Sequence, residues 1–379
     1  MRLTSARSAV AAFSWTALAL SNVSAQSDPV SLSLVDAPFA LLGSRGGAPD
    51  TLFAGVVGAV RLGGPRTAVA DVGSYAIRLF GSNDELTKTV GRNGAGPGEF
   101  RFLYWIGLCG PDTLLAVDGA LNRATVLRAS DGFVVRTVAL PTWLSFDSMV
   151  ACLETNQLLV LVDKPRPLGP PGQVTRTPAT LVRLNISSGQ VDTLAALAGT
   201  EYFFAARAPG YVDLPLGSRA LATAGGGRVY YAQSTSSTVT SLDLRSGALR
   251  SLPHGLPVRK STARTWERAK ADRIAQEPME RHRTLLRAVL DEASAPEQQP
   301  AFEAMIADRA GQLWLRSPTL DAATSVWRVF DSSGRHLASV TLPVSLDPLD
   351  ISDGELLAVH REPDGSESIR IYPLPNLRR

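Results

Sequence analysis

The feature that most constrains the fold is a turn that recurs at nearly regular spacing. Gly132, Gly189 and Gly247 each end a small polar turn, and they lie 57 and 58 residues apart. Related turns occur at Asp84 and Gly334, the latter after a longer gap. Short β-branched and apolar runs separate the turns, which is typical of strands joined by tight hairpins. With a further hairpin near the C-terminus, the pattern predicts an all-β chain of six repeated units.

Six units of four strands each match a six-bladed β-propeller, in which four-stranded sheets surround a central channel. We expect Val30–Leu42 to supply the outer strand of the last unit, because closing the ring protects the sheet edges. Two packed β-sandwiches are the alternative, but they do not predict near-regular turn spacing. The expected units span residues 52–91, 101–140, 146–198, 201–252, 300–342 and 346–374.

Three stretches carry a resemblance to a known group. Asp71–Phe80 resembles an NHL repeat, in which an aspartate, a polar loop and an Ile or Val precede a Phe and a turn. Gly91–Phe100, with its Gly-Pro-Gly-Glu-Phe end, is similar to the inter-blade signature of bacterial six-bladed propellers. Pro300–Leu315 is similar to the start of a blade in that group. The resemblance implies a six-bladed, NHL/TolB-like propeller, in a group that contains both binding scaffolds and enzymes.

The first 25 residues have the pattern of an export signal. Arg2 and Arg7 precede an apolar stretch, and Val23-Ser24-Ala25 is a small-x-small cleavage pattern. The apolar stretch is too short to span a bilayer, although an uncleaved anchor or a buried helix remains an alternative. We therefore expect a signal peptide over 1–25 and one secreted or periplasmic domain over 26–379, without a membrane span.

Composition narrows the classes of partner. Hydrophobic residues make up 45% and charged residues 19% of the 379 residues, which argues against long disorder. The formal charge of +3 falls to +1 once Arg2 and Arg7 are removed with the signal. This balance gives no reason to expect a nucleic-acid partner.

A helical insertion is expected over about 259–297, between the fourth and fifth units. The stretches 262–276 and 279–293 place apolar residues at helical spacing, among them Leu285, Leu286 and Val289. One interpretation is that this apolar stripe packs on the propeller and stiffens one face. The other is that the helices form a lid or a partner-docking element over the channel mouth.

Cys109 and Cys152 are the only cysteines, and they occupy similar places in the second and third units. An exported protein permits a disulfide, and adjacent inner strands can bring two Cα atoms within the required ~7 Å. Each cysteine as a small buried apolar residue is the alternative. The sequence leaves both open.

Carboxylates are the remaining source of chemistry, because the sequence lacks a HExxH pair, a CxxC, a Walker loop and a GxSxG. Asp147 and Asp350 lie near the starts of expected channel-lining strands in opposite units. They are candidate ligands for a hard cation such as Ca²⁺, or else solvated turn residues. A recurrent set of aspartates is expected instead to accept backbone bonds in turns: Asp71, Asp118, Asp163 and Asp308.

We expect a binding scaffold rather than an enzyme, recognising a protein, peptide or glycan through one face of the ring and needing no cofactor. The alternative is a divalent-metal-dependent hydrolase of the lactonase or strictosidine-synthase-like kind, with Ca²⁺ in the central channel. A domain detached from a larger assembly is a third interpretation.

Overall fold

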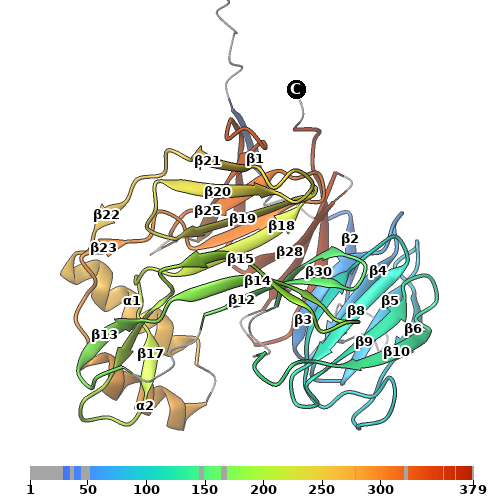
Figure 1. Cartoon of the computed structure of the whole chain (residues 1–379), viewed down its shortest axis with the longest axis horizontal. Helices are drawn as coiled ribbons and strands as arrows, with labels where there is room; N and C mark the ends of the chain where they lie inside the picture. Colours follow the sequence, from blue (N-terminus) through green and yellow to red (C-terminus); the bar gives the residue numbers. More distant parts are fainter. Residues whose placement is uncertain are drawn as a thin grey trace, which may run out of the picture.

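The computed structural model describes residues 29–34, 38–43, 52–144, 149–163, 169–277, 279–319, 323–352, 354–362 and 364–377. The expected signal peptide, residues 1–25, lies outside this part of the chain. The described residues are mostly β-strand, with two helices (Figure 1). None of these helices is long and apolar enough to cross a membrane.

Most strands belong to sheets of four consecutive or nearly consecutive strands. The first sheet contains β3 (Val56–Arg61), β4 (Thr67–Asp71), β5 (Ala76–Phe80) and β6 (Leu86–Val90). The second contains β7 (Leu103–Leu108), β8 (Thr113–Asp118), β9 (Arg123–Arg128) and β10 (Val134–Ala139). The third contains β11 (Met149–Glu154), β12 (Gln157–Val162), β14 (Ala179–Asn185) and β15 (Val191–Leu197). Neighbouring strands within each sheet are antiparallel.

The same pattern continues through the second half of the chain. The fourth sheet contains β18 (Ala220–Gly225), β19 (Arg228–Gln233), β20 (Thr238–Asp243) and β21 (Leu249–Pro253). The fifth contains β24 (Ala304–Ala307), β25 (Leu313–Arg316), β26 (Thr324–Phe330) and β27 (His336–Pro343). The sixth contains β28 (Leu346–Ser352), β29 (Glu355–Arg361) and β30 (Glu367–Pro373).

Two N-terminal strands complete the last two sheets. β2 (Ala40–Leu42) pairs antiparallel with β30 as the outer strand of the sixth sheet. β1 (Val30–Ser33) instead pairs parallel with β27 and extends the fifth sheet. The expectation for Val30–Leu42 is therefore correct for its second half and wrong for its first half. A parallel edge pairing leaves no hairpin signal in the sequence, because the partner strand is distant along the chain.

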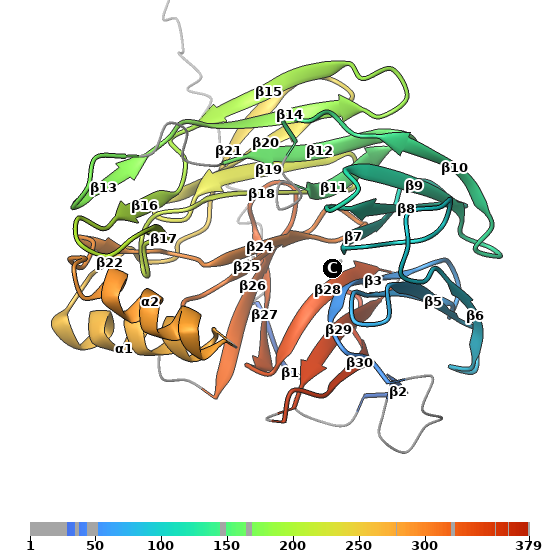
Figure 2. The same ribbon diagram turned by 90° about the horizontal axis from the view of Figure 1, so that it is seen from below.

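The sheets pack face to face around a central axis, as Figure 2 shows. Strands such as β4 and β5 are buried along their whole length, because both faces of their sheet contact neighbouring sheets. One apolar cluster joins Ile77 of the first sheet to Leu114 of the second. Another joins Val69 of the first sheet to Leu357 of the sixth. The first and last sheets are thus in contact, and the predicted propeller-type architecture is confirmed.

A second, smaller group of elements lies beside this ring, and we call it the satellite module. It contains a three-stranded sheet, a two-stranded ribbon and a helical pair. Its members are β13 (Gln173–Arg176), β16 (Glu201–Phe204), β17 (Tyr211–Asp213), β22 (Arg259–Lys260), β23 (Gln298–Gln299), α1 (Ala263–Ala275) and α2 (Glu280–Leu290). Figure 1 shows the helices next to β13 and β17 at one side of the molecule.

The two predicted helices are present within a few residues of their expected bounds. Thr262 begins α1 by accepting a hydrogen bond from the Thr265 backbone N–H at 3.2 Å, which satisfies an otherwise free helical donor. The apolar side of the pair packs on the three-stranded sheet, where Trp266 and Val289 contact Phe203 and Val212. Figure 2 shows the helices beside the ring and not over its centre. The helical pair therefore covers a small sheet that the sequence interpretation had not identified.

That sheet also corrects the expected fourth unit. β16 pairs with β13 and β17 pairs with β16, so residues 201–213 belong to this small sheet and the fourth sheet begins only at Ala220. The physical reason is that β13 is inserted between β12 and β14 and offers β16 a free edge. Strand pairing over that distance is invisible to local spacing.

Candidate functional site

The central channel contains a cavity of about 770 Å³ lined by the six inner strands β3, β7, β11, β18, β24 and β28. Its wall consists mainly of small and apolar side chains. The charged residues that line it are Arg228, Arg309 and Asp350. Arg228 is already paired with Asp243, at 2.9 Å. The described channel wall therefore offers one carboxylate, that of Asp350, to a bound group.

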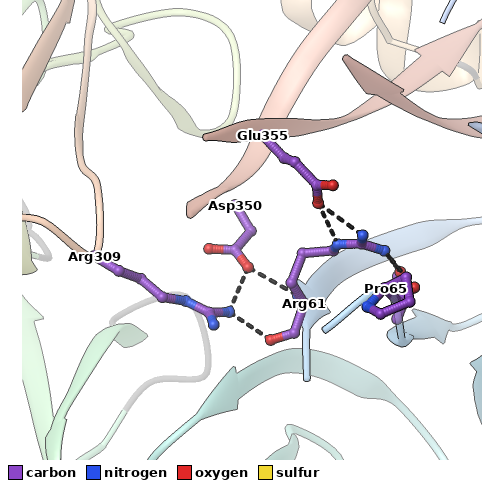
Figure 3. Close-up of polar contacts among 6 residues, drawn as sticks. Arg61, Pro65, Arg309, Asp350 and Glu355 are labelled. Carbon is purple, nitrogen blue, oxygen red and sulfur yellow. Dashed lines mark hydrogen bonds and ion pairs between the residues drawn. The ribbon is translucent and has the colours of Figure 1, made fainter. Parts of the chain in front are cut away.

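The Asp350 carboxylate already binds two partners. Figure 3 shows the Arg309 guanidinium directed at Asp350, with Nη2 2.5 Å from Oδ2. The backbone N–H of Arg61 donates to the same oxygen at 2.8 Å. Arg309 Nη2 also donates to the Arg61 carbonyl oxygen at 2.6 Å. Asp350 thus links the first, fifth and sixth sheets at the channel.

The Arg61 side chain extends this network to a second carboxylate. Its Nε and Nη2 each lie 2.7 Å from Glu355 Oε2, and its Nη1 donates to the Pro65 carbonyl and Thr67 Oγ1 (Figure 3). Arg61 is only 3% exposed. Because β3 belongs to the first sheet and β28 and β29 to the last, these contacts join the two ends of the ring.

The structure describes only one of the two residues of the predicted Asp147–Asp350 cation site. Asp147 lies outside the described residues, and Asp350 accepts bonds from Arg61 and Arg309. Within the described residues, no group of three or more His, Cys, Asp or Glu side chains is arranged to hold a metal ion. Calcium takes six to eight oxygen ligands. The site stays a prediction.

The recurrent aspartates accept hydrogen bonds from turns, as expected. Asp118 Oδ2 accepts from the backbone N–H of Arg101 and Phe102, and Oδ1 accepts from Leu121. Asp71 plays the same part in the first sheet, where its Oδ1 accepts from the Gly73 N–H. Each of these two aspartates joins the loop that precedes the innermost strand of its sheet to the turn that follows the second strand.

The other two recurrent aspartates act in different loops. Asp163 accepts from the Thr200 backbone N–H and hydroxyl, at 3.0 and 2.5 Å. Asp308 follows an inner strand and accepts from the Gln312 N–H at 2.7 Å. Asp71, Asp118 and Asp308 therefore stabilise turns, as expected, whereas Asp163 joins two loops that are 37 residues apart in the chain.

Cys109 and Cys152 form a disulfide, with Cα atoms 5.0 Å apart. Cys109 follows β7, and Cys152 lies within β11, so the bond joins the second and third sheets near the channel. Both cysteines also pack in the apolar cluster between these sheets. The disulfide is therefore present and the alternative of two free, buried cysteines is wrong; Cys109 is buried and Cys152 is partly buried.

A groove separates the satellite module from the fourth, fifth and sixth sheets. One part, of about 690 Å³, lies between β17, α2 and the start of β18. The other part, of about 840 Å³, lies between α1 and the sheets that carry Arg316 and Arg361. Arg219 and Arg273 line both parts. We call the first part the strand groove and the second the arginine groove.

The arginine groove carries an excess of positive charge, whereas the strand groove is balanced, with Arg219 and Arg273 beside Asp213 and Glu277. The arginine groove is lined by five arginines and by three carboxylates, of Asp272, Glu303 and Asp347. At the junction, Arg219 Nη2 and Arg273 Nε approach the single Asp213 carboxylate, at 2.5 and 3.7 Å. One carboxylate between two guanidinium groups leaves a positive charge that anionic groups can neutralise.

The sequence interpretation missed these groove residues. The one local signal is the aromatic hairpin Tyr202–Tyr211, whose rings lie 5.8 Å apart across a Pro-Gly turn. Their relation to α2 depends on elements distant along the chain. No spacing rule could bring Arg219 and Arg273 together.

The sequence matches no protein-family model, and no curated protein matches it. Among solved structures, the chain is similar to a candidate exported protein from Bacteroides fragilis, with 12% identity and a TM-score of 0.50. That match covers 92% of this chain and 100% of the other. A member of the DUF4221 family from Bacteroides vulgatus matches with 8% identity and a TM-score of 0.50, covering 86% and 95% of the two chains. At such identity these similarities concern the fold alone.

Proposed function

We propose that the protein is an exported six-bladed β-propeller with NHL-like repeats, which binds a protein, peptide or glycan on the side of the ring next to the satellite module. Two observations support export. The sequence of residues 1–25 has the pattern of a cleaved signal. The Cys109–Cys152 disulfide suits an oxidising compartment.

The number of blades and the repeat type are supported by the order of the sheets. Among the described sheets of the ring, five have four strands and one has five. These six sheets follow one another along the chain. The Gly91–Phe100 segment connects the first sheet to the second, in the place that an inter-blade signature requires. Within it, Phe100 is fully buried, and the Gly96 N–H donates to Glu99 Oε2 at 2.7 Å.

The observation that carries the binding function is the pair of adjoining grooves with shared arginines. Ligand sites are concave and combine apolar walls with a few placed polar groups. The strand groove supplies Leu285, Leu286 and Val289, and the junction supplies Arg219 and Arg273. Arg219 and Arg273 are partly exposed, at 42% and 33% of their side chains, so they are accessible to a ligand.

Affinity capture tests this function. The mature chain, immobilised, would be exposed to the proteins and glycans of its native envelope, beside an Arg219→Ala/Arg273→Ala variant. We expect a specific ligand that the wild type retains and the double variant loses. Arg92→Ala is the matched control. Arg92 is also an exposed arginine, its ion pair is with Glu99, and it is distant in sequence from the residues that line the grooves. A ligand retained equally by all three proteins, or no ligand at all, would contradict the proposal.

The metal-dependent hydrolase remains the competing function. It requires several inward oxygen ligands in the channel in addition to Asp350. Metal analysis of the purified protein, combined with a panel of lactones and phosphoesters, separates the two functions. Stoichiometric metal and turnover that Asp350→Asn abolishes would favour the hydrolase.

A further inference from the structure

β17 has an outer edge that no described strand covers. In the three-stranded sheet the order is β13-β16-β17, so β17 pairs only with β16. The pairs Glu201–Leu214 and Ala205–Gly210 are hydrogen-bonded, since Leu214 N–H donates to Glu201 O and Ala205 N–H donates to Gly210 O. Bonded and non-bonded pairs alternate in an antiparallel ladder. The N–H and C=O groups of Tyr211 and Asp213 therefore point away from β16.

The strand groove runs along this edge. All three residues of β17 line it, although successive side chains of a strand point to opposite faces of the sheet. A cavity that contacts both kinds of side chain lies beside the strand and not over one face. Figure 2 shows α2 next to β17, and Leu285, Leu286 and Val289 of α2 also line the groove. The groove is thus bounded by a free strand edge and the apolar side of a helix.

We propose that the strand groove binds an extended peptide segment, which adds to β17 as a further strand and places a carboxylate at Arg219 and Arg273. This inference rests on the proposed binding function and specifies its ligand. Strand addition uses backbone hydrogen bonds for affinity and pockets for alternate side chains for specificity. Tyr211 and Asp213 supply the backbone donors and acceptors, and the α2 side supplies the apolar pocket.

Charge complementarity selects an acidic segment. Arg219 and Arg273 share the single Asp213 carboxylate at the junction with the arginine groove, which has five arginines against three carboxylates. The other carboxylate of the strand groove, that of Glu277, lies 3.3 Å from His282. An aspartate, a glutamate or a free C-terminus of the peptide would make charge-assisted bonds there. The exposed apolar side chains of Tyr211 and Leu285, which are 46% and 41% exposed, would be covered at the same time.

The probe is a displayed library of random linear ten-residue peptides with free C-termini, panned on the full mature chain. We expect enrichment of sequences with alternating apolar residues next to a carboxylate. Binding of a synthesised winner is then measured by fluorescence anisotropy. N-methylation of single peptide bonds should weaken it about tenfold at every second residue and little between, because only alternate N–H groups face β17.

Two variants give independent readouts. Tyr211→Pro removes an outward N–H that makes no bond within the sheet, and it should weaken binding of the selected peptide about tenfold. The thermal unfolding midpoint of the variant shows whether it still folds. Arg273→Gln should weaken binding of the acidic peptide, but not binding of the analogue in which an amide replaces the carboxylate. Arg92→Gln is the control and should change neither.

The outcomes separate this inference from the proposed function. Strand addition would be supported if N-methylation weakens binding at every second residue and if Arg273→Gln weakens binding of the acidic peptide alone. A library without enriched peptides, or winners that are indifferent to N-methylation, would overturn it. If the envelope capture described above still yields a ligand lost in Arg219→Ala/Arg273→Ala, the binding function stands while strand addition fails. If capture fails as well, both fail.

Discussion

The backbone N–H of Ala208 donates a 2.7 Å hydrogen bond to the carboxylate of Glu292, which joins the end of the α2 segment to the β16–β17 turn. The N–H groups of Ala206 and Arg207 donate to the same carboxylate. These amides, that of Ala208 foremost, lower the pKa of Glu292 below its usual value. The side chain is only 8% exposed. One carboxylate therefore holds the hairpin that carries β17 against the helices that face it.

Replacing Glu292 by Gln should loosen this hairpin in a pH-dependent way. A carboxyl group with a lowered pKa in the folded state contributes stability above its ordinary pKa, and that contribution is lost as the pH falls through the lowered value. At neutral pH the variant should show faster amide exchange at residues 206–208 than the wild type. As the pH falls below the ordinary range of a glutamate pKa and the wild-type carboxylate becomes protonated, the difference should shrink.

The control for that experiment is Glu280→Gln. Glu280 is the first residue of α2, the helix that Glu292 follows, and it has 74% of its side chain exposed and an ion pair to Arg283. It should leave exchange at residues 206–208 unchanged. Equal exchange in Glu292→Gln and the wild type at neutral pH would contradict the assigned role of Glu292.

Removing the Arg61 side chain should destabilise the ring where it closes. Arg61→Ala leaves Glu355 without its guanidinium partner, and loss of one member of a buried ion pair costs about 3 kcal/mol. Urea unfolding measures the loss. Arg92→Ala breaks the exposed Arg92–Glu99 pair and should change the unfolding free energy by less than about 1 kcal/mol. Comparable losses in the two variants would show that the Arg61 contacts do not hold the ring.

Asp118→Ala should cost about 2 kcal/mol, because it leaves the backbone N–H groups of Arg101, Phe102 and Leu121 without their acceptor. Asp118→Asn should cost less, since its amide oxygen retains part of this role. The exposed turn residue Asp131 in the same sheet is the control, and its replacement by Ala should cost about 0.5 kcal/mol or less. Thermal or urea unfolding ranks the three. An Asp118→Ala variant as stable as Asp131→Ala would refute the assigned role.

The Cys109–Cys152 bond should stabilise the protein by about 4 kcal/mol, since it closes a loop with a sequence separation of 43 residues. Cys109→Ala/Cys152→Ala, compared with the wild type in urea, measures this contribution. Alkylation followed by mass spectrometry should label two thiols only after reduction. Labelling of thiols in a chain that has been denatured but not reduced would show that the bond is absent.

Much of the ring could be predicted from local patterns. Hairpin turns such as Gly132 and Gly247 require positive φ, at 66° and 72°, and therefore mark strand ends directly in the sequence. The two helices followed from apolar spacing and from Thr262, whose cap bond depends on a residue three positions away. These features depend on interactions between residues close along the chain, which a sequence displays.

The groove could not be predicted in the same way. β16 pairs with β13 across an intervening hairpin, and β1 pairs with β27 from the other end of the chain. Asp350 looked like an open cation ligand because its sequence position does not reveal Arg309, which approaches it from another sheet. Such contacts are decided by the closing of the ring.

The sequence by itself determined most strands and turns of the four-stranded sheets, the two helices, and the roles of Asp71 and Asp118, because these depend on periodicity and on bonds within one repeat. The tertiary structure alone decided that Cys109 meets Cys152, that Arg219 and Arg273 share Asp213, and that the edge of β17 faces α2. The physical reason is that packing of whole sheets fixes the distances between residues remote in sequence. A binding surface assembled from such residues exists only in the folded chain.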